Sequence, residues 1–309
     1  MVVLISSNRN FRGTIEDDFL KINRSKGVTR RLIVNGGDGN DVVIGSFGRD
    51  KILGGNGNDI VSAGRGNDTV FGGNGDDIVY GGSGRDYIFG GRGNDSLFGG
   101  SGNDRLVDRF GSDLLDGGNG NDYLRSVSDN GEPIPAQDPN GLINQFGNFG
   151  TYSPNDTLTG GSGRDTFEIR ALLDAKRSII EQHLDEDGNI DWRGIAGENG
   201  NVHDHWVQNF GTDTITDYEA GVDQIRLVGH TIAIESVTDK TDEIGRAYTE
   251  ILIWSDQGAD GQGGGGAHDL DRLGVLNVYG DSVTAADIEV NAGVFYGAYN
   301  NISQVPEID

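Results

Sequence analysis

A nine-residue repeat between residues 36 and 125 limits the possible folds of this chain more than any other feature. With Gly36 as position one, the register continues without a gap through ten units. Position four is always glycine: Gly39, Gly48, Gly57, Gly66, Gly75, Gly84, Gly93, Gly102, Gly111 and Gly120. Position six is always aspartate: Asp41, Asp50, Asp59, Asp68, Asp77, Asp86, Asp95, Asp104, Asp113 and Asp122. Position eight is always aliphatic: Val43, Ile52, Val61, Val70, Val79, Ile88, Leu97, Leu106, Leu115 and Leu124.

Position one is the less regular column. It is glycine in eight units, but Ala63 and Asp108 replace it in the other two. Asp108 opens the most degenerate unit, "DRFGSDLLD" (108–116). The position-one glycines are Gly36, Gly45, Gly54, Gly72, Gly81, Gly90, Gly99 and Gly117.

Each unit is expected to form a six-residue turn followed by a three-residue strand. Glycines permit the positive φ angles of a tight turn, and the side chain at position eight points away from those at positions seven and nine. One unit cannot bury its single aliphatic side chain, so the units must stack. With two units per coil, the repeat predicts five coils that rise by about 4.8 Å each around a narrow aliphatic core.

The composition indicates an ordered but strongly acidic chain. Of 309 residues, 34% are apolar and 53 are glycine, and 49 acidic against 24 basic residues give a net charge of −25. Such a surface repels nucleic acid and anionic membranes and attracts cations. The absence of cysteine excludes disulfides and thiolate metal sites. We expect no N-terminal signal peptide, no membrane insertion and, because apolar positions recur regularly, no disorder in the repeat.

Stacked units would place aspartate over aspartate along each edge of the coil. Repulsion between these charges, together with unpaired carbonyl groups in the turns, would oppose stacking. A hard divalent cation between adjacent turns removes both penalties, with glycine carbonyls and aspartate carboxylates as ligands. Ca²⁺ accepts about 6–8 oxygen ligands in flexible geometry, whereas Mg²⁺ requires a stricter octahedron. We therefore predict multiple Ca²⁺ ions as part of the fold; the alternative is that the aspartates only cap the turns.

The units "GGNGNDIVS" (54–62), "GGNGDDIVY" (72–80) and "GGSGRDYIF" (81–89) resemble the RTX nonapeptide of hemolysin-type calcium-binding proteins. The resemblance implies a parallel β-roll with Ca²⁺ between turns i and i+2, and hence about eight inter-turn sites. The site count falls if the unit at Asp108 loses its ion. Ions would be shared along Asp41, Asp59, Asp77, Asp95 and Asp113 on one edge, and along Asp50, Asp68, Asp86, Asp104 and Asp122 on the other.

The resemblance also implies a secreted protein, extracellular or at the cell surface of a Gram-negative-type bacterium. Ca²⁺ would drive its folding after type I secretion, because the cytoplasm holds little free Ca²⁺. We expect a non-enzymatic structural or interaction module. The alternatives are an adhesin or polysaccharide-binding module, or a hydrolase or sugar-modifying enzyme with an unrecognised site. No G-x-S-x-G motif or isolated acid pair supports catalysis.

Five segments flank the repeat of residues 36–125. We expect cap strands in 1–35, a surface loop in 126–150, a second short roll segment in 151–168, a short helical insertion in 169–210, and a C-terminal β cap with a secretion signal in 211–309. The second roll segment has Asp156 and Asp165 at position six. In the β cap, the resemblance implies one last ion through Asp213 and Asp217.

Two further motifs lie in the helical insertion. The acidic turn at 185–191 is left open as an accessory Ca²⁺ site, because it lacks the terminal glutamate of an EF-hand loop. His203 and His205 lack the spacing of a zinc protease and are expected to pack or to form hydrogen bonds.

Apolar side chains also face outward from the predicted roll. One wall carries Leu53, Phe71, Phe89 and Val107, and the other carries Val42, Ile44, Ile60, Ile78, Tyr80, Phe98 and Leu114. Outward apolar rows usually contact something. The rows predict cover by the 170–185 helix or the C-terminal strands, or else contact with a protein partner or a second copy of the chain.

Overall fold

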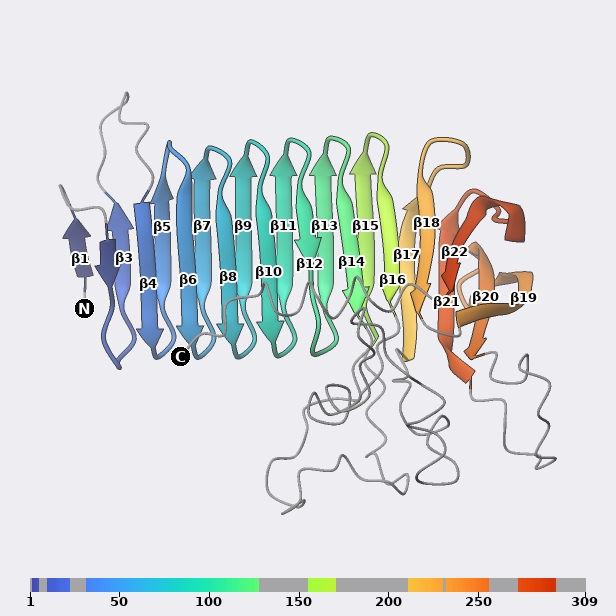
Figure 1. The fold of residues 1–309 in the computed structure, drawn as a ribbon, viewed down its shortest axis with the longest axis horizontal. Coiled ribbons are helices and arrows are strands. Elements are labelled where there is room, and N and C mark those ends of the chain that lie inside the picture. The colour runs from blue at the N-terminus through green and yellow to red at the C-terminus, as the bar shows by residue number, and fades with distance from the viewer. Residues whose placement is uncertain are drawn as a thin grey trace, which may run out of the picture.

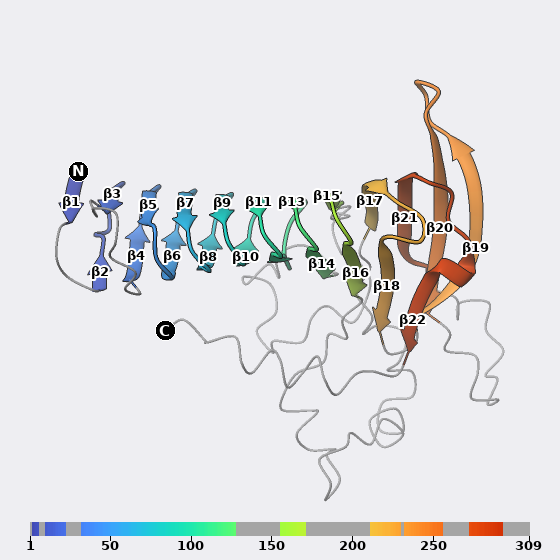
Figure 2. The same cartoon turned by 90° about the horizontal axis from the view of Figure 1, so that it is seen from above.

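The computed structural model shows an elongated roll of two facing sheets (Figure 1). It describes residues 2–5, 10–22, 32–127, 155–170, 211–229, 232–255 and 272–292. From β1 to β18, odd-numbered strands lie in one sheet and even-numbered strands lie in the other, so the chain changes sheet after each of these strands. Seen from above, the two rows of strands end in a long hairpin at the C-terminal end (Figure 2). The predicted parallel β-roll is confirmed.

The strands of the two sheets have the following bounds. Sheet A is ordered β1 (Val2–Ile5), β3 (Phe19–Ile22), β5 (Val42–Ser46), β7 (Ile60–Arg65), β9 (Ile78–Ser83), β11 (Ser96–Ser101), β13 (Leu114–Asn119), β15 (Thr157–Ser162), β17 (Gly211–Tyr218), β21 (Arg272–Gly280), β20 (Ala247–Ser255) and β19 (Ile232–Thr241). Sheet B is ordered β2 (Asn10–Arg12), β4 (Leu32–Asp38), β6 (Asp50–Asn56), β8 (Thr69–Asn74), β10 (Tyr87–Arg92), β12 (Arg105–Val107), β14 (Tyr123–Val127), β16 (Thr166–Arg170), β18 (Gln224–Gly229) and β22 (Ile288–Ala292).

Neighbouring strands pair in parallel with an offset of two repeat units. Val61 of β7 pairs with Val79 of β9, and Ile52 of β6 pairs with Val70 of β8. The prediction of three-residue strands was wrong, since β8 to β11 each have six residues. Pairing continues through the glycine pair, as in Gly73 with Gly91, because the missing Cβ atoms let the backbones of adjacent coils approach.

The core is the column of position-eight side chains. All ten are 0% exposed, which confirms the predicted aliphatic interior. The column continues beyond the ten units at both ends of the roll, through the buried side chains of Leu20, Val34, Leu158, Phe167, Ile215 and Ile225. Burial of this continuous apolar row favours the coiled arrangement.

Residues 155–170 are not a second roll. Leu115 of β13 pairs with Leu158 of β15, and Leu124 of β14 pairs with Phe167 of β16. The chain therefore re-enters the same two sheets in register after the segment 128–154. At the other end, β2 and β3 pair in parallel with β4 and β5, so the N-terminal strands add to the roll.

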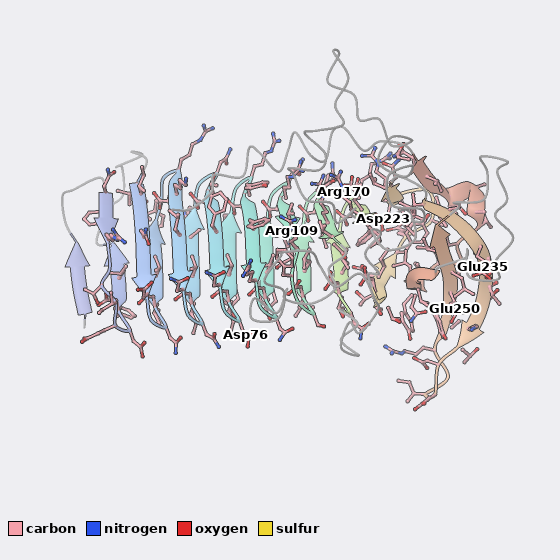
Figure 3. The ribbon with its side chains drawn as sticks, turned by 60° about the horizontal axis from the view of Figure 1, so that its bottom comes forward. Asp76, Arg109, Arg170, Asp223, Glu235 and Glu250 are labelled. Carbon is pink, nitrogen blue, oxygen red and sulfur yellow. The ribbon has the colours of Figure 1, made fainter. Side chains whose placement is uncertain are left out.

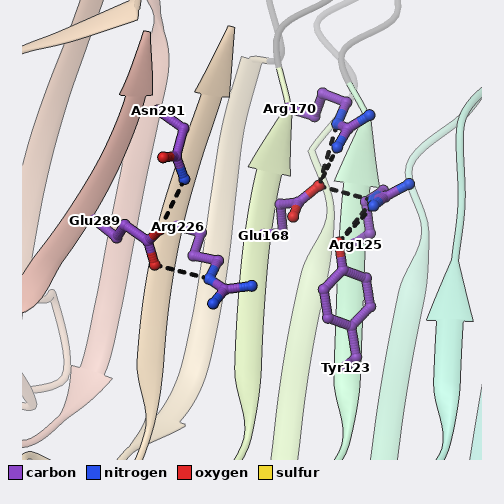
Figure 4. Close-up of polar contacts among 7 residues, drawn as sticks. All are labelled: Tyr123, Arg125, Glu168, Arg170, Arg226, Glu289 and Asn291. Atoms are coloured by element: carbon purple, nitrogen blue, oxygen red, sulfur yellow. Dashed lines mark hydrogen bonds and ion pairs between the residues drawn. The ribbon is translucent and has the colours of Figure 1, made fainter. Parts of the chain in front are cut away.

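A charged network crosses the outer face of sheet B where the chain returns (Figure 4). The Glu168 carboxylate contacts Arg125 at 2.9 Å and Arg170 at 2.7 Å, and Arg125 also donates to the Tyr123 hydroxyl. Although burial opposes ionisation, the two guanidinium groups hold the pKa of Glu168 below its ordinary value. The network links β14 to β16 and so favours their register.

The C-terminal strands complete both sheets. β21 pairs in parallel with β17, and β22 pairs in parallel with β18. β20 is antiparallel to both β21 and β19, so the predicted antiparallel pairing holds for only part of this segment. The helical insertion was predicted for 169–210, but its first two residues belong to β16. Residues 171–210, with the acidic turn 185–191, His203 and His205, lie outside the described residues.

Candidate metal-binding edges of the roll

Two columns of aspartate side chains follow the edges of the roll, where the turns join the sheets. The first ladder is Asp18, Asp41, Asp59, Asp77, Asp95, Asp113, Asp156 and Asp213. The second ladder is Asp50, Asp68, Asp86, Asp104, Asp122, Asp165 and Asp223. All of these side chains except that of Asp223 are at most 5% exposed.

In every ladder residue after the first of each column, Asp18 and Asp50, one carboxylate oxygen accepts a backbone N–H of the preceding coil. The N–H of Asp59 donates to Oδ1 of Asp77 at 2.7 Å, and the N–H of Asp77 donates to Oδ1 of Asp95 at 2.7 Å. Between Asp113 and Asp156 the same bond joins residues that are further apart in the sequence. The N–H of Asp113 donates to Oδ1 of Asp156 at 2.9 Å, with a separation of 43 residues instead of the usual 18. Each carboxylate thus satisfies a turn amide that no strand partner reaches.

In many of these aspartates the other carboxylate oxygen has no hydrogen-bond partner among the described residues. Among the described residues, the buried Oδ2 atoms of one set of ladder aspartates accept no hydrogen bond: Asp41, Asp59, Asp68, Asp77, Asp86, Asp95, Asp104, Asp122 and Asp165. A buried carboxylate oxygen without a donor is costly. A repeated row of such atoms therefore requires a cation or a proton at each rung.

The position-one glycines leave a gap beside these oxygens. A Cβ at Gly81 would lie 2.7 Å from Oδ2 of Asp86 and 2.8 Å from the carbonyl oxygen of Gly99. A Cβ at Gly117 would likewise lie 2.6 Å from Asp122 and 2.8 Å from the Gly160 carbonyl oxygen. A carboxylate of one coil and a carbonyl of the next converge on each gap. This donor set is the one that Ca²⁺ prefers, so the residues present fit the predicted ion.

Position five forms a second hydrogen-bonded column that the sequence analysis missed. The N–H of Asn58 donates to Oδ1 of Asn40 at 2.7 Å, and the N–H of Asn94 donates to Oδ1 of Asp76 at 2.8 Å. These side chains accept from the following coil, whereas ladder aspartates accept from the preceding one. Asp76 lies at the outer edge of the roll (Figure 3). The frequent Asn or Asp before the invariant aspartate was the available signal.

The structure does not bring Asp213 and Asp217 together. Asp213 belongs to the first ladder, where its Oδ1 accepts the N–H of Asp156 at 3.0 Å. Asp217 accepts the N–H groups of Gly160 and Gly161, at 2.9 and 2.7 Å, beside the second ladder. Because β17 crosses the wall of the roll, its two aspartates reach opposite edges.

Two ladder residues were not among the predicted sites. Asp18 precedes buried Leu20 by two residues, and Asp223 precedes buried Ile225 by two residues. This is the spacing of positions six and eight in the repeat. A second signal was one repeat glycine in each preceding turn: Gly13 stands at position one before Asp18, and Gly221 stands at position four before Asp223.

Without a cation, burial raises the pKa of Asp77 to about 8 and those of Asp59 and Asp68 to about 7, from 3.8. The folded chain then binds more protons than the unfolded chain between pH about 4 and about 8, so its stability falls as pH rises through this window. We predict that the chain, once a chelating resin has removed its Ca²⁺, contains more β structure at pH about 5.5 than at pH about 8. Far-UV circular dichroism measures this difference.

In millimolar Ca²⁺ the chain should instead contain more β structure at pH about 8 than at pH about 5.5, because protons compete with the cation for the carboxylates. A Ca²⁺-free chain that gains β structure as pH rises would contradict the burial of these carboxyls.

Comparison with known proteins identifies the repeat. A family model of the RTX calcium-binding nonapeptide repeat (4 copies) matches residues 35–70, 63–97, 71–106, 98–131 and 155–168. No curated protein matches the chain. Among solved structures, the chain is similar to the crystal structure of extracellular lipase LipA from Serratia marcescens, with 14% identity, a TM-score of 0.21, and coverage of 84% of this chain and 44% of that one. The chain thus spans less than half the length of that lipase. Residues 35–131 and 155–168 are therefore RTX calcium-binding nonapeptide repeats, and these repeats form most of the parallel β-roll.

Proposed function

We propose that this protein is a secreted structural module whose β-roll folds only when Ca²⁺ is available. The observation that carries the proposal is the row of buried Oδ2 atoms without a hydrogen-bond partner, beside Oδ1 atoms that accept backbone N–H groups of the preceding coil. When bound, Ca²⁺ supplies the positive charge that these oxygens lack. The ladder aspartates and the carbonyl groups of the position-one residues are the groups that would hold it.

The ladders themselves make folding depend on the cation. Each rung brings a buried carboxylate close to the next, and its Oδ1 must accept a backbone N–H for the turn to close. Ionised rungs repel one another in a buried environment. At low free Ca²⁺ the chain therefore stays loose, and at millimolar Ca²⁺ the binding free energy becomes folding free energy.

A Ca²⁺ titration tests this proposal. Starting in excess EGTA at neutral pH, we expect the far-UV and near-UV circular dichroism to change steeply as free Ca²⁺ rises, because rungs on each ladder fill cooperatively. Mg²⁺ at the same concentration and ionic strength is the control and should produce little change. Spectra that stay the same from EGTA to millimolar Ca²⁺ would refute the proposal.

We further propose export through a type I system, with the signal in residues 211–309. In the described part of the chain, no helix is long and apolar enough to cross a membrane. Co-expression with a type I exporter should deliver the full chain to the medium, whereas deletion of the last part of 211–309 should retain it in the cell. Equal export of both forms would exclude this segment as the signal.

We propose a non-catalytic role, supported by the backbone bonds that occupy the repeat carboxylates. Binding to a partner through the outward rows stays a prediction. Tyr80 stacks on Phe98 at 5.0 Å and is 45% exposed, whereas Val107 is only 5% exposed and Lys51 lies over the Phe71 ring. Tyr80→Ser combined with Phe98→Ser should lower any self-association seen by sedimentation; an unchanged profile would remove this role.

A further inference from the structure

The unit 108–116 departs from the repeat because Asp108 stands where a glycine is expected. From the repeat pattern alone, this unit could lose its ion. The backbone at Asp108 remains attached to the next coil, since its N–H donates to the carbonyl oxygen of Arg125 at 3.0 Å. Its side chain is 0% exposed, so the extra carboxylate lies inside the roll.

The carboxylate of Asp108 is held in a fixed direction. Its Oδ1 accepts the N–H of Gly91 at 3.0 Å and the N–H of Arg109 at 2.7 Å. Its Oδ2 is buried and has no hydrogen-bond partner among the described residues. This second oxygen therefore faces a place that no N–H or O–H donor of the described chain occupies.

That place is the gap at Gly90. A Cβ at Gly90 would lie 2.5 Å from Oδ2 of Asp95 and still closer to Oδ2 of Asp108. At Gly117 the corresponding neighbours are Oδ2 of Asp122 and the carbonyl oxygen of Gly160. At Gly90, a charged side-chain oxygen therefore occupies the position that a neutral carbonyl oxygen has in a regular unit.

A third carboxylate completes the group. One oxygen each from Asp95, Asp108 and Asp113 lies within 4.8 Å of the other two, and these residues are the only such set of three in the part of the chain that the structure describes. All three side chains are buried. Three ionised carboxylates at this spacing require a cation among them.

We propose that Asp95, Asp108 and Asp113 form a three-carboxylate site that binds Ca²⁺ more tightly than the sites of the regular units. The proposal rests on the Ca²⁺ binding proposed above. The affinity of an all-oxygen Ca²⁺ site increases with the charge and the rigidity of its ligands. Asp108 adds one buried charge to this turn, and its two backbone hydrogen bonds fix the direction of that charge.

Release of Ca²⁺ from the folded protein tests the proposal. The full chain, loaded in millimolar Ca²⁺, is mixed with an excess of a fluorescent chelator, and the amplitude of each phase gives the number of ions released. In the unmodified chain, one ion should leave about tenfold more slowly than the others. Asp108→Asn keeps the size and the hydrogen-bond acceptor but removes the charge, and should abolish this slow phase. Asp108→Gly restores the repeat glycine and should do the same.

Ala63→Gly is the matched control, because it also restores a position-one glycine but removes no carboxylate. It should keep the slow phase. A slow phase that persists in both Asp108 variants, or that is absent from the unmodified chain, would overturn the site. Failure of both Asp108 variants to fold in millimolar Ca²⁺ would also overturn it, in favour of a purely structural role. If the unmodified chain bound no Ca²⁺, the proposed function itself would fail, whereas equal release from all variants removes only this site.

Discussion

Gly73→Ala is expected to destabilise the Ca²⁺-loaded roll by more than about 3 kcal/mol. Gly73 has φ +130°, a conformation that L side chains rarely adopt, and its Cβ would lie 2.9 Å from the carbonyl carbon of Gly55, with the carbonyl oxygen closer still. The backbone cannot move away, because Gly73 pairs with Gly55 on one side and with Gly91 on the other. Urea unfolding in saturating Ca²⁺, followed by circular dichroism, measures the change.

Gly221→Ala separates backbone strain from this close approach. Gly221 also has a positive φ, +76°, but a Cβ there would meet no atom within 4 Å. The variant should lose only about 1 kcal/mol, the cost of the left-handed conformation. If Gly73→Ala costs no more than Gly221→Ala, contact between the glycine pairs of adjacent coils does not determine the spacing of the roll.

Asp77→Asn should have opposite effects with and without Ca²⁺. The asparagine keeps an oxygen that can accept the N–H of Asp59, but it removes one charge from the middle of the first ladder. In saturating Ca²⁺ at pH about 8 we expect the free energy of unfolding to fall by about 3 kcal/mol, because the bound cations would lose one buried carboxylate charge. In EGTA the variant should retain at least as much β structure as the unmodified chain, since burial raises the pKa of Asp77 to about 8 and disfavours its charge.

Asp76→Asn is the matched control for this variant, because it removes the same charge one residue away. Asp76 is exposed, and its Oδ1 accepts the N–H of Asn94, which an asparagine oxygen can also do. The unfolding free energy in Ca²⁺ should change by no more than about 0.5 kcal/mol. Equal losses in the two variants would show that total charge, and not the buried ladder, controls folding.

The sequence was most informative where one physical requirement repeats. The aliphatic column from Val43 to Leu124 had to be buried, and every member is. It was less informative about the strands. The glycine pairs looked like turn residues, yet Gly73 and Gly91 lie inside paired strands, because glycine also allows close backbone contact.

The ends of the ladders were harder to predict. The turns of Asp18 and Asp223 keep only one repeat glycine each, Gly13 and Gly221. The hydrogen bonds from the N–H of Asp18 to Asp41 and from the N–H of Asp165 to Asp223 show that these two residues continue the columns. Asp213 and Asp217 were close in sequence and similar in type, but β17 takes them to different edges. Asp108 looked like the loss of a consensus glycine, whereas its fully buried side chain adds a third carboxylate to the turn of Asp95.

The nine-residue period alone was enough to predict the coil of two units, its aliphatic interior and the acidic edges that require Ca²⁺, because each of these depends on side chains at fixed intervals along one chain. The pairing of Leu158 and Phe167 with the columns of the same roll, and the grouping of Asp95, Asp108 and Asp113, were fixed only by folding. These features depend on which coils become neighbours. That pairing is selected by burial and backbone hydrogen bonding across the stacked turns, and no local pattern of residues encodes it.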